Sequence, residues 1–197
     1  MTPLAGDIVG PVPDGRVPDD YDRLRRRVLW SLPSGLYVLG TRAGPRRNLM
    51  TVSWVTQVAL SPKLIGVGVE QAALTHELLV ESGVFTLNLL ARRDRSLVRH
   101  FVKPVRDIAV DEETGLGTMN GVPVSGAPSG APILADAVAW LDCEVRHRLP
   151  LGSHSWFVGE VTDVGEAEKG SGPHTPDDDG DAGGILRMED TRMNYGG

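Results

Sequence analysis

The stretch NLMTVSWVTQVALSP, residues 48–62, predicts a β-strand with two chemically different faces. Its apolar residues recur at every second position: Met50, Val52, Trp54, Val58 and Leu60. Thr56 interrupts this row, and Thr51, Ser53 and Gln57 lie on the opposite face, because successive side chains of a strand alternate in direction. Two interpretations follow: the polar face lies in water, as in most half-buried strands, or it lines a site.

The next segment, KLIGVGVE at 63–70, favours a site. Its isoleucine and valines share one face, and Gly66 and Gly68 share the other. Glycine weakens a strand interior and is found at bulges or where another group approaches the backbone closely. Beside the hydroxyl groups of 48–62, these glycines would leave a shallow slot floored by main chain. Such a slot suits a planar ligand.

Composition indicates one domain with a substantial core. The chain has 197 residues, of which 41% are hydrophobic, enough for a single domain. The net charge of −6 argues against a nucleic-acid-binding surface. The basic run at 23–27 is diluted by neighbouring aspartates, which predicts a solvated helix face.

Cysteine usage and hydropathy bear on the compartment. Cys143 is the only cysteine, so no internal disulfide can form and a reducing compartment is expected. No apolar run approaches the length of a membrane span, and MTPLAGDIVG lacks a charged segment followed by an apolar one. We therefore expect a cytoplasmic protein with no membrane segment.

The chain is expected to comprise a flexible segment, 1–17, and a single domain, 18–197. Asp19 is the candidate N-cap of an amphipathic helix whose apolar residues have helical spacing: Tyr21, Leu24, Val28 and Leu32. The remaining elements are expected as strand 35–41, helix 74–82, strand 84–90, helix 94–102, an irregular crossing 107–135, a hairpin of 139–149 with 154–164, and a flexible acidic loop 165–184. Many strands, few short helices and no βαβ alternation predict a mainly β, antiparallel barrel with helical decoration.

Several segments, in this order, resemble the flavin reductase family: PSGLYVLGT, NLMTVSWVTQVALSP, LIGVGVE, THELLVESGVFTLNLL, HSWFVGEV and the terminal YGG. The resemblance runs from about Leu32 to Asp163 and resumes at the end of the chain. It implies the FMN-binding split-barrel fold, with FMN or FAD held by a homodimer. It also implies reduction of that flavin by NAD(P)H, in many members for a partner monooxygenase.

The same resemblance implies a flavin-binding strand, because the segment corresponding to 48–53 holds the flavin in the family. The candidate cofactor-binding residues on it are Asn48, Met50, Thr51, Val52 and Ser53. Hydroxyl and main-chain N–H groups of this strand would face the ring edge, the ribityl chain or the phosphate.

A phosphate needs donors and positive potential, which a helix N-terminus supplies. Thr75 lies where the helix is expected to begin, and His76 beside it is a candidate donor to a phosphate oxygen. An ordinary N-cap role for Thr75 is also open, and the two roles are compatible.

His154 opens the last hairpin strand, in GSHSWFVGEV. In the family, the matching histidine lies near the reactive face of the flavin, where it contacts the nicotinamide or assists proton transfer. A single histidine at a strand start is otherwise often a surface residue. His154 is the candidate catalytic residue.

Other residues have plainer interpretations. His147 shares a face with Cys143 and is expected to be packed, and Trp54 is expected in the core or in a dimer interface. No metal site is expected: His174 lies near aspartates, but its segment lacks the spaced ligands of a rigid site. GSG at 170–172 does not repeat the dinucleotide fingerprint.

Two classes of function remain open. One is an NAD(P)H:flavin oxidoreductase, with FMN or FAD as the flavin. The other is a flavoredoxin-like electron carrier that holds FMN without nicotinamide activity. The intact GSHSWFVGEV segment favours the enzyme.

Overall fold

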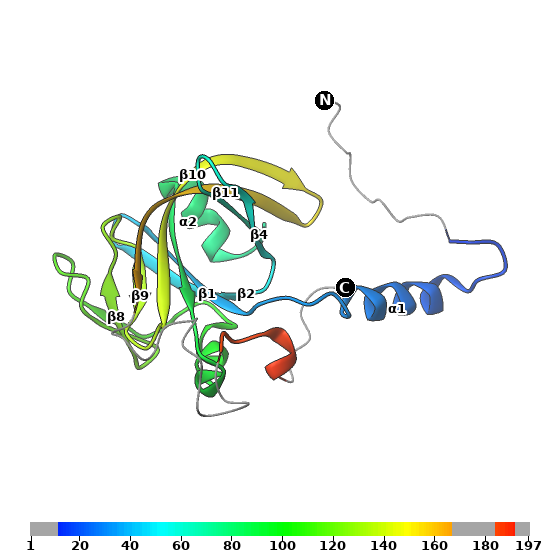
Figure 1. Cartoon of the computed structure of the whole chain (residues 1–197), viewed down its shortest axis with the longest axis horizontal. Helices are drawn as coiled ribbons and strands as arrows, with labels where there is room; N and C mark the ends of the chain where they lie inside the picture. Colours follow the sequence, from blue (N-terminus) through cyan, green and yellow to red (C-terminus); the bar gives the residue numbers. More distant parts are fainter. Residues whose placement is uncertain (1–11, 167–183, 192–197) are drawn as a thin grey trace.

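The structure is a computed structural model that describes residues 12–166 and 184–191 (Figure 1). Its larger sheet has seven strands in the order β2-β1-β5-β10-β11-β4-β3. The bounds of these strands are β1 (Tyr37–Ala43), β2 (Arg46–Val52), β3 (Val55–Ala59), β4 (Leu64–Glu70), β5 (Val84–Leu89), β10 (Ala139–Leu151) and β11 (His154–Glu166). Every strand pair in it is antiparallel.

A smaller antiparallel sheet has the order β6-β7-β8-β9. Its strands are β6 (Ile108–Val110), β7 (Gly117–Met119), β8 (Val122–Gly126) and β9 (Pro132–Leu134). The helices are α1 (Pro18–Leu29), α2 (Leu74–Ser82) and the short 3-10 helices η1 (Arg92–Asp94), η2 (Leu97–Phe101) and η4 (Met188–Asp190).

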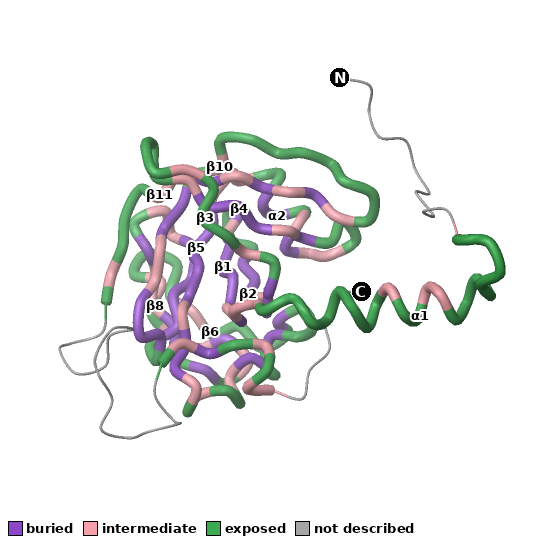
Figure 2. The backbone as a smooth tube through the Cα atoms, turned by 45° about the vertical axis from the view of Figure 1, so that its right-hand side comes forward, coloured by how far each residue is buried: buried purple, intermediate pink, exposed green. Residues whose placement is uncertain are grey.

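The architecture is a split β-barrel of the antiparallel type. The large sheet is not closed, since β2 and β3 are its two edges, although only Ser53 and Trp54 separate them in the chain. Phe85, Phe157 and Cys143 belong to the core of the large sheet, and α2 packs against β1 and β2. A second core, around Phe101 and Met119, joins η2 to the small sheet. Figure 2 shows buried backbone concentrated in the strands of the main body.

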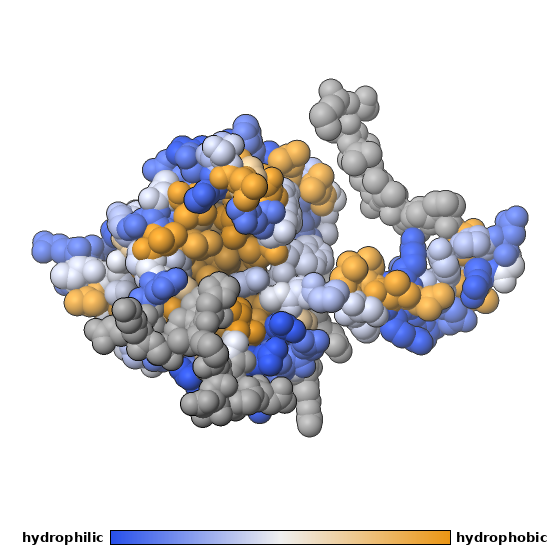
Figure 3. All heavy atoms as spheres, viewed as in Figure 1, coloured by the Kyte–Doolittle hydropathy of each residue, from blue (hydrophilic) through white to orange (hydrophobic). Residues whose placement is uncertain are grey.

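α1 projects away from the main body (Figure 1). None of its residues is buried, and Figure 3 shows apolar side chains along one side of it. The N-cap is Val17, without a side-chain capping bond, so the prediction of Asp19 as N-cap is wrong. Pro18 explains the early start, because its fixed φ suits the first helical position. Asp19 lies in the first turn, where a negative charge favours the helix dipole.

The predicted strand 48–62 is two strands with a bend at Ser53 and Trp54. Burial along these two strands does not follow the expected alternation, because β2 is buried on both faces and β3 is largely exposed. Thr51 is buried, whereas Trp54 is 43% exposed and Leu60 is 78% exposed. The apolar row therefore does not form one core face.

Three further predictions are corrected by the structure. The crossing 107–135 contains the small sheet, and the helix expected at 94–102 is replaced by η1 and η2. His147 is exposed, because both faces of β10 are exposed from Arg146 to the end of the strand, beyond the core. The predicted hairpin itself is confirmed. Most of the acidic loop 165–184, together with His174, the GSG segment and the terminal YGG, lies outside the described residues.

Candidate functional site

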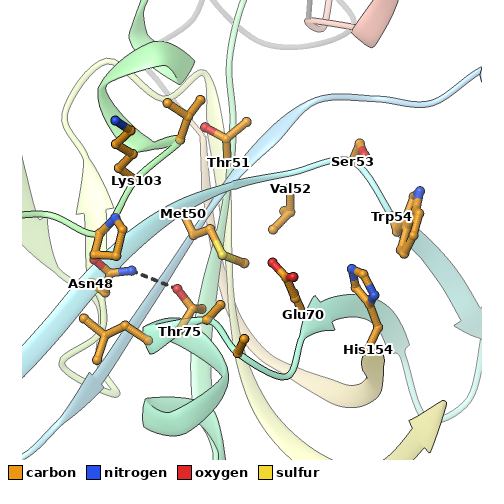
Figure 4. Close-up of a pocket in the computed structure, with 16 residues that line it drawn as sticks. Asn48, Met50, Thr51, Val52, Ser53, Trp54, Glu70, Thr75, Lys103 and His154 are labelled. Atoms are coloured by element: carbon orange, nitrogen blue, oxygen red, sulfur yellow. Dashed lines mark hydrogen bonds between the residues drawn. The ribbon is translucent and has the colours of Figure 1, made fainter. Parts of the chain in front are cut away.

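A pocket of about 450 Å³ opens where the end of β2 meets the start of α2 and the start of β11. This volume lies within the range of small-molecule and cofactor sites. The predicted catalytic residue, His154, lines it, and so do six of the seven predicted cofactor-binding residues: Asn48, Met50, Thr51, Val52, Ser53 and Thr75. Figure 4 shows these side chains converging from separate elements.

One end of the pocket is built around Thr75, whose side chain is fully buried. The Asn48 amide Nδ2 donates to Thr75 Oγ1 at 2.8 Å (Figure 4), and Asn48 Oδ1 accepts from the Val105 backbone N–H at 2.9 Å. Asn48 thus fastens the 102–105 loop to α2. Since Thr75 Oγ1 accepts this bond, its own proton remains free to donate, and no described residue accepts it.

The backbone at this end also offers donors. α2 begins after Ala73, which provides no side-chain cap, so the interpretation of Thr75 as an N-cap is wrong. The earliest helical N–H bonded within the helix start is that of His76, to the Ala73 carbonyl. The N–H groups of Leu74 and Thr75 have no protein acceptor within the described ranges, and both residues line the pocket. Free N–H groups at a helix N-terminus form an anion-binding site.

Lys103 supplies a full positive charge to the same end of the pocket. In residues 12–166 and 184–191, no carboxylate pairs with its ammonium group. Free N–H groups, a free hydroxyl proton and an unpaired cation together fit a phosphate group. Lys103 was not predicted, because it belongs to an irregular segment that long-range contacts position: the burial of Phe101 and Val105 in the core and the bond of Val105 to Asn48.

The wall of the pocket is the last part of β2. Thr51 Oγ1 already donates to the Val98 carbonyl at 2.6 Å, so its hydroxyl is engaged with η2. Ser53 is nearly buried, and its hydroxyl has no hydrogen-bond partner among the described residues. Met50 and Val52 add apolar surface between them. Ser53 is therefore the hydroxyl of this wall that is available to a ligand.

The other end of the pocket carries His154, Trp54 and Glu70. The rings of Trp54 and His154 are 4.6 Å apart between centroids, and Ser153 Oγ lies 2.8 Å from His154 Nδ1. These contacts hold the imidazole at the pocket rim, with Nε2 free of protein partners within the described chain (Figure 4). Trp54 and Glu70 were not predicted as site residues. The bend after Ser53 brings Trp54 here.

The glycine slot expected on β4 is already occupied by protein. A Cβ on Gly66 would lie 2.4 Å from the Trp156 ring, and one on Gly68 would lie 3.1 Å from the Trp54 ring. The glycines thus admit two tryptophan side chains, and the interpretation of both as a ligand slot is wrong. Gly68 still lines the pocket, underneath Trp54.

His76 does not line this pocket. Its Nε2 lies 2.8 Å from Ser155 Oγ, and its ring meets Phe157 edge-on, with 5.3 Å between ring centroids. Burial lowers the pKa of His76, and the positive charge of Arg148 lowers it further. Both effects favour the neutral imidazole of His76, which lines the hollow beside α2.

Comparison with known proteins identifies the architecture. Residues 29–181 match the sequence model of the flavin reductase like domain. The chain belongs to this family. It is 34% identical over 150 residues to an NADH-dependent FAD reductase of Streptomyces globisporus, covering 76% of this chain and 79% of that protein. It is 30% identical to an NADH-dependent FMN reductase of Streptomyces nodosus subsp. asukaensis, with 75% and 77% covered.

Solved structures agree on the flavin reductase fold. The NADH:FAD oxidoreductase of Streptomyces globisporus C-1027 superposes with a TM-score of 0.62 at 29% identity, covering 79% of this chain and 88% of that one.

The chain also matches the sequences of diflavin flavoproteins of cyanobacteria, at 29% identity to one from Nostoc and 31% to one from Synechocystis. It spans only about a quarter of their length, 23% and 24% respectively.

Within the described residues, no helix is both long and apolar enough to cross a membrane.

Proposed function

We propose that this chain is an NADH-dependent flavin reductase that holds FMN or FAD in the pocket between β2, α2 and β11. The observation that carries this proposal is the pairing of two unlike pocket ends. The Thr75 end combines free N–H donors with the cation of Lys103, and the His154 end carries an imidazole at the rim. This polarity fits a flavin with its phosphate at Thr75 and its ring towards His154.

The flavin, when bound, supplies the ring that accepts a hydride from the nicotinamide. The residues of this chain bind and orient the two reactants. Ser53 is placed to hydrogen-bond the ring or its ribityl chain, while Met50 and Val52 exclude water from one side. His154 is placed to contact the nicotinamide or to hold a proton at Nε2. The names of the FAD and FMN reductases reported above support NADH as the donor.

The test is a visible absorption spectrum of the purified protein with FMN or FAD, recorded anaerobically before and after NADH or NADPH. We expect the flavin absorbance to bleach in catalytic turnover with NADH. Bound flavin that neither nucleotide bleaches would contradict a reductase and support the flavoredoxin-like carrier. A protein that binds no flavin would contradict both.

We expect the protein to be a homodimer with its flavin pocket next to the subunit interface. Leu149 and Leu151 on β10 are exposed, and they share the outward face of the sheet with His154 because Leu151 pairs with His154 across the hairpin. Trp54 adds exposed aromatic surface beside His154. Exposed apolar side chains gathered near one site are typical of an interaction surface.

Light scattering at micromolar concentration checks this expectation, and Leu149→Glu should shift the protein towards monomer. Glu144, an exposed residue of the same strand, offers Glu144→Gln as the control. A strict monomer that still binds FMN tightly would contradict a composite site between subunits.

A monooxygenase that consumes reduced flavin is the partner class we propose. The support is a structural neighbour described as the styrene monooxygenase flavin reductase of Pseudomonas putida S12, with 25% identity and a TM-score of 0.58. Reduced flavin transfer from this protein to a monooxygenase would be seen as product formation that depends on both proteins.

A further inference from the structure

A second hollow, of about 640 Å³, adjoins the flavin pocket on the far side of the α2 start. The two hollows share a wall made of Ala72, Ala73, Leu74 and Pro104. The second one continues along α2, past His76 and Val80, and Arg148 of β10 also lines it. The second hollow therefore lies next to the Thr75 end of the flavin pocket, across the residues that the two share. We call it the α2 groove.

The α2 groove carries an unpaired positive charge. In residues 12–166 and 184–191, Arg148 makes no hydrogen bond or ion pair with another side chain. The acid that also lines the groove, Glu77, is engaged with Arg46 Nη1 at 2.6 Å. Arg148 thus faces the groove as a free cation, as Lys103 does in the flavin pocket.

The rest of the α2 groove is suited to a base. Leu74, Val80 and Pro104 give it apolar surface, and Gln71 and His76 give it polar groups. A mostly apolar lining with a few polar groups is typical of small-molecule and cofactor sites. Together, the groove and the pocket offer two cations, one on each side of the shared wall.

We propose that the α2 groove binds the adenylate half of FAD, so that Lys103 faces one phosphate and Arg148 the other. This inference rests on the proposed flavin site. It assigns FAD as the preferred flavin, since FMN ends at the Thr75 side and leaves the groove unused. The adenylate of NADH has the same chemistry. FAD is favoured because the groove adjoins the proposed phosphate end through the residues that both hollows share, whereas the nicotinamide is expected at the opposite end, beside His154.

The experiment compares the affinities of FMN and FAD by fluorescence titration in the wild type and in Arg148→Ala. We expect the wild type to bind FAD more tightly. Arg148→Ala should weaken the binding of FAD about fivefold, as expected for loss of an exposed ion pair. The affinity for FMN should change less than about twofold. Arg146→Ala is the matched control, because Arg146 lies on the same strand but pairs with Glu144 and Glu160.

A second variant tests whether the ligand occupies the α2 groove, independently of the charge of Arg148. Val80 is 49% exposed, so Val80→Glu should fold and should place a negative charge beside the adenylate phosphate, weakening FAD but not FMN. Equal affinities for both flavins in the wild type, unaffected by either variant, would overturn the inference while leaving the flavin site intact. A raised KM for NADH with unchanged FAD affinity in Arg148→Ala would also overturn it and assign the groove to the nicotinamide dinucleotide. Failure to bind either flavin would instead overturn the proposed function.

Discussion

His154→Ala is expected to slow flavin reduction by NADH about 10- to 100-fold while flavin affinity stays nearly unchanged. The imidazole lies at the Trp54 end of the pocket, away from the Thr75 end that is proposed to hold the phosphate. Hydride transfer is mainly the chemistry of the flavin and the nicotinamide, so a side chain that positions or donates a proton changes the rate only moderately. Stopped-flow bleaching of bound flavin at saturating NADH measures this step, because binding defects vanish there.

Two controls separate this effect from general damage. His147→Ala removes an exposed histidine from the neighbouring strand and should leave the bleaching rate unchanged. Ser53→Ala should weaken flavin binding and leave the rate at saturation largely intact, since Ser53 belongs to the wall of the pocket. If flavin bound to His154→Ala bleaches at the wild-type rate, His154 has no role in reduction and is only a turn residue of the hairpin.

Thr75→Val is expected to weaken FMN binding roughly 10- to 100-fold, the value of a lost hydrogen bond to a charged group. The affinity for riboflavin, which has no phosphate, should fall much less. The reason is the direction of the bond: Thr75 Oγ1 accepts from Asn48, so its proton is free for a phosphate oxygen. The ratio of FMN to riboflavin affinity, measured by fluorescence titration, reports this difference.

Thr75 is fully buried, so its variant can also lose stability, because Asn48 Nδ2 then lacks an acceptor. Lys103→Met avoids this difficulty, since Lys103 is exposed and unpaired among the described residues. Lys103→Met should lower the ratio of FMN to riboflavin affinity without changing Tm. Lys63→Met, on the turn between β3 and β4, is the matched control. If neither Thr75→Val nor Lys103→Met changes the ratio of FMN to riboflavin affinity, the phosphate binds elsewhere.

The sequence by itself determined local elements and the pairing of strands that follow one another in the chain. Alternation of polar and apolar residues predicted β10 and β11 as a hairpin, and Gly83 ended α2 in the left-handed conformation. These features depend on the nearest residues, because side-chain alternation and turn conformation are local properties. The resemblance of ordered segments to flavin reductases implied the split barrel and seven of the sixteen residues that line the pocket.

Only the tertiary structure decided which faces are covered. Periodicity indicates that a strand has two faces, but the packing partners determine which one is buried. Gly66 and Gly68 show this: the neighbouring strand and the bend after Ser53 bring Trp156 and Trp54 over them, where a ligand slot was expected. The long-range bonds of Asn48 likewise assemble the Thr75 end of the pocket, which we propose holds the phosphate. They join β2 to α2 and to the loop of Lys103, across 27 and 57 residues of sequence.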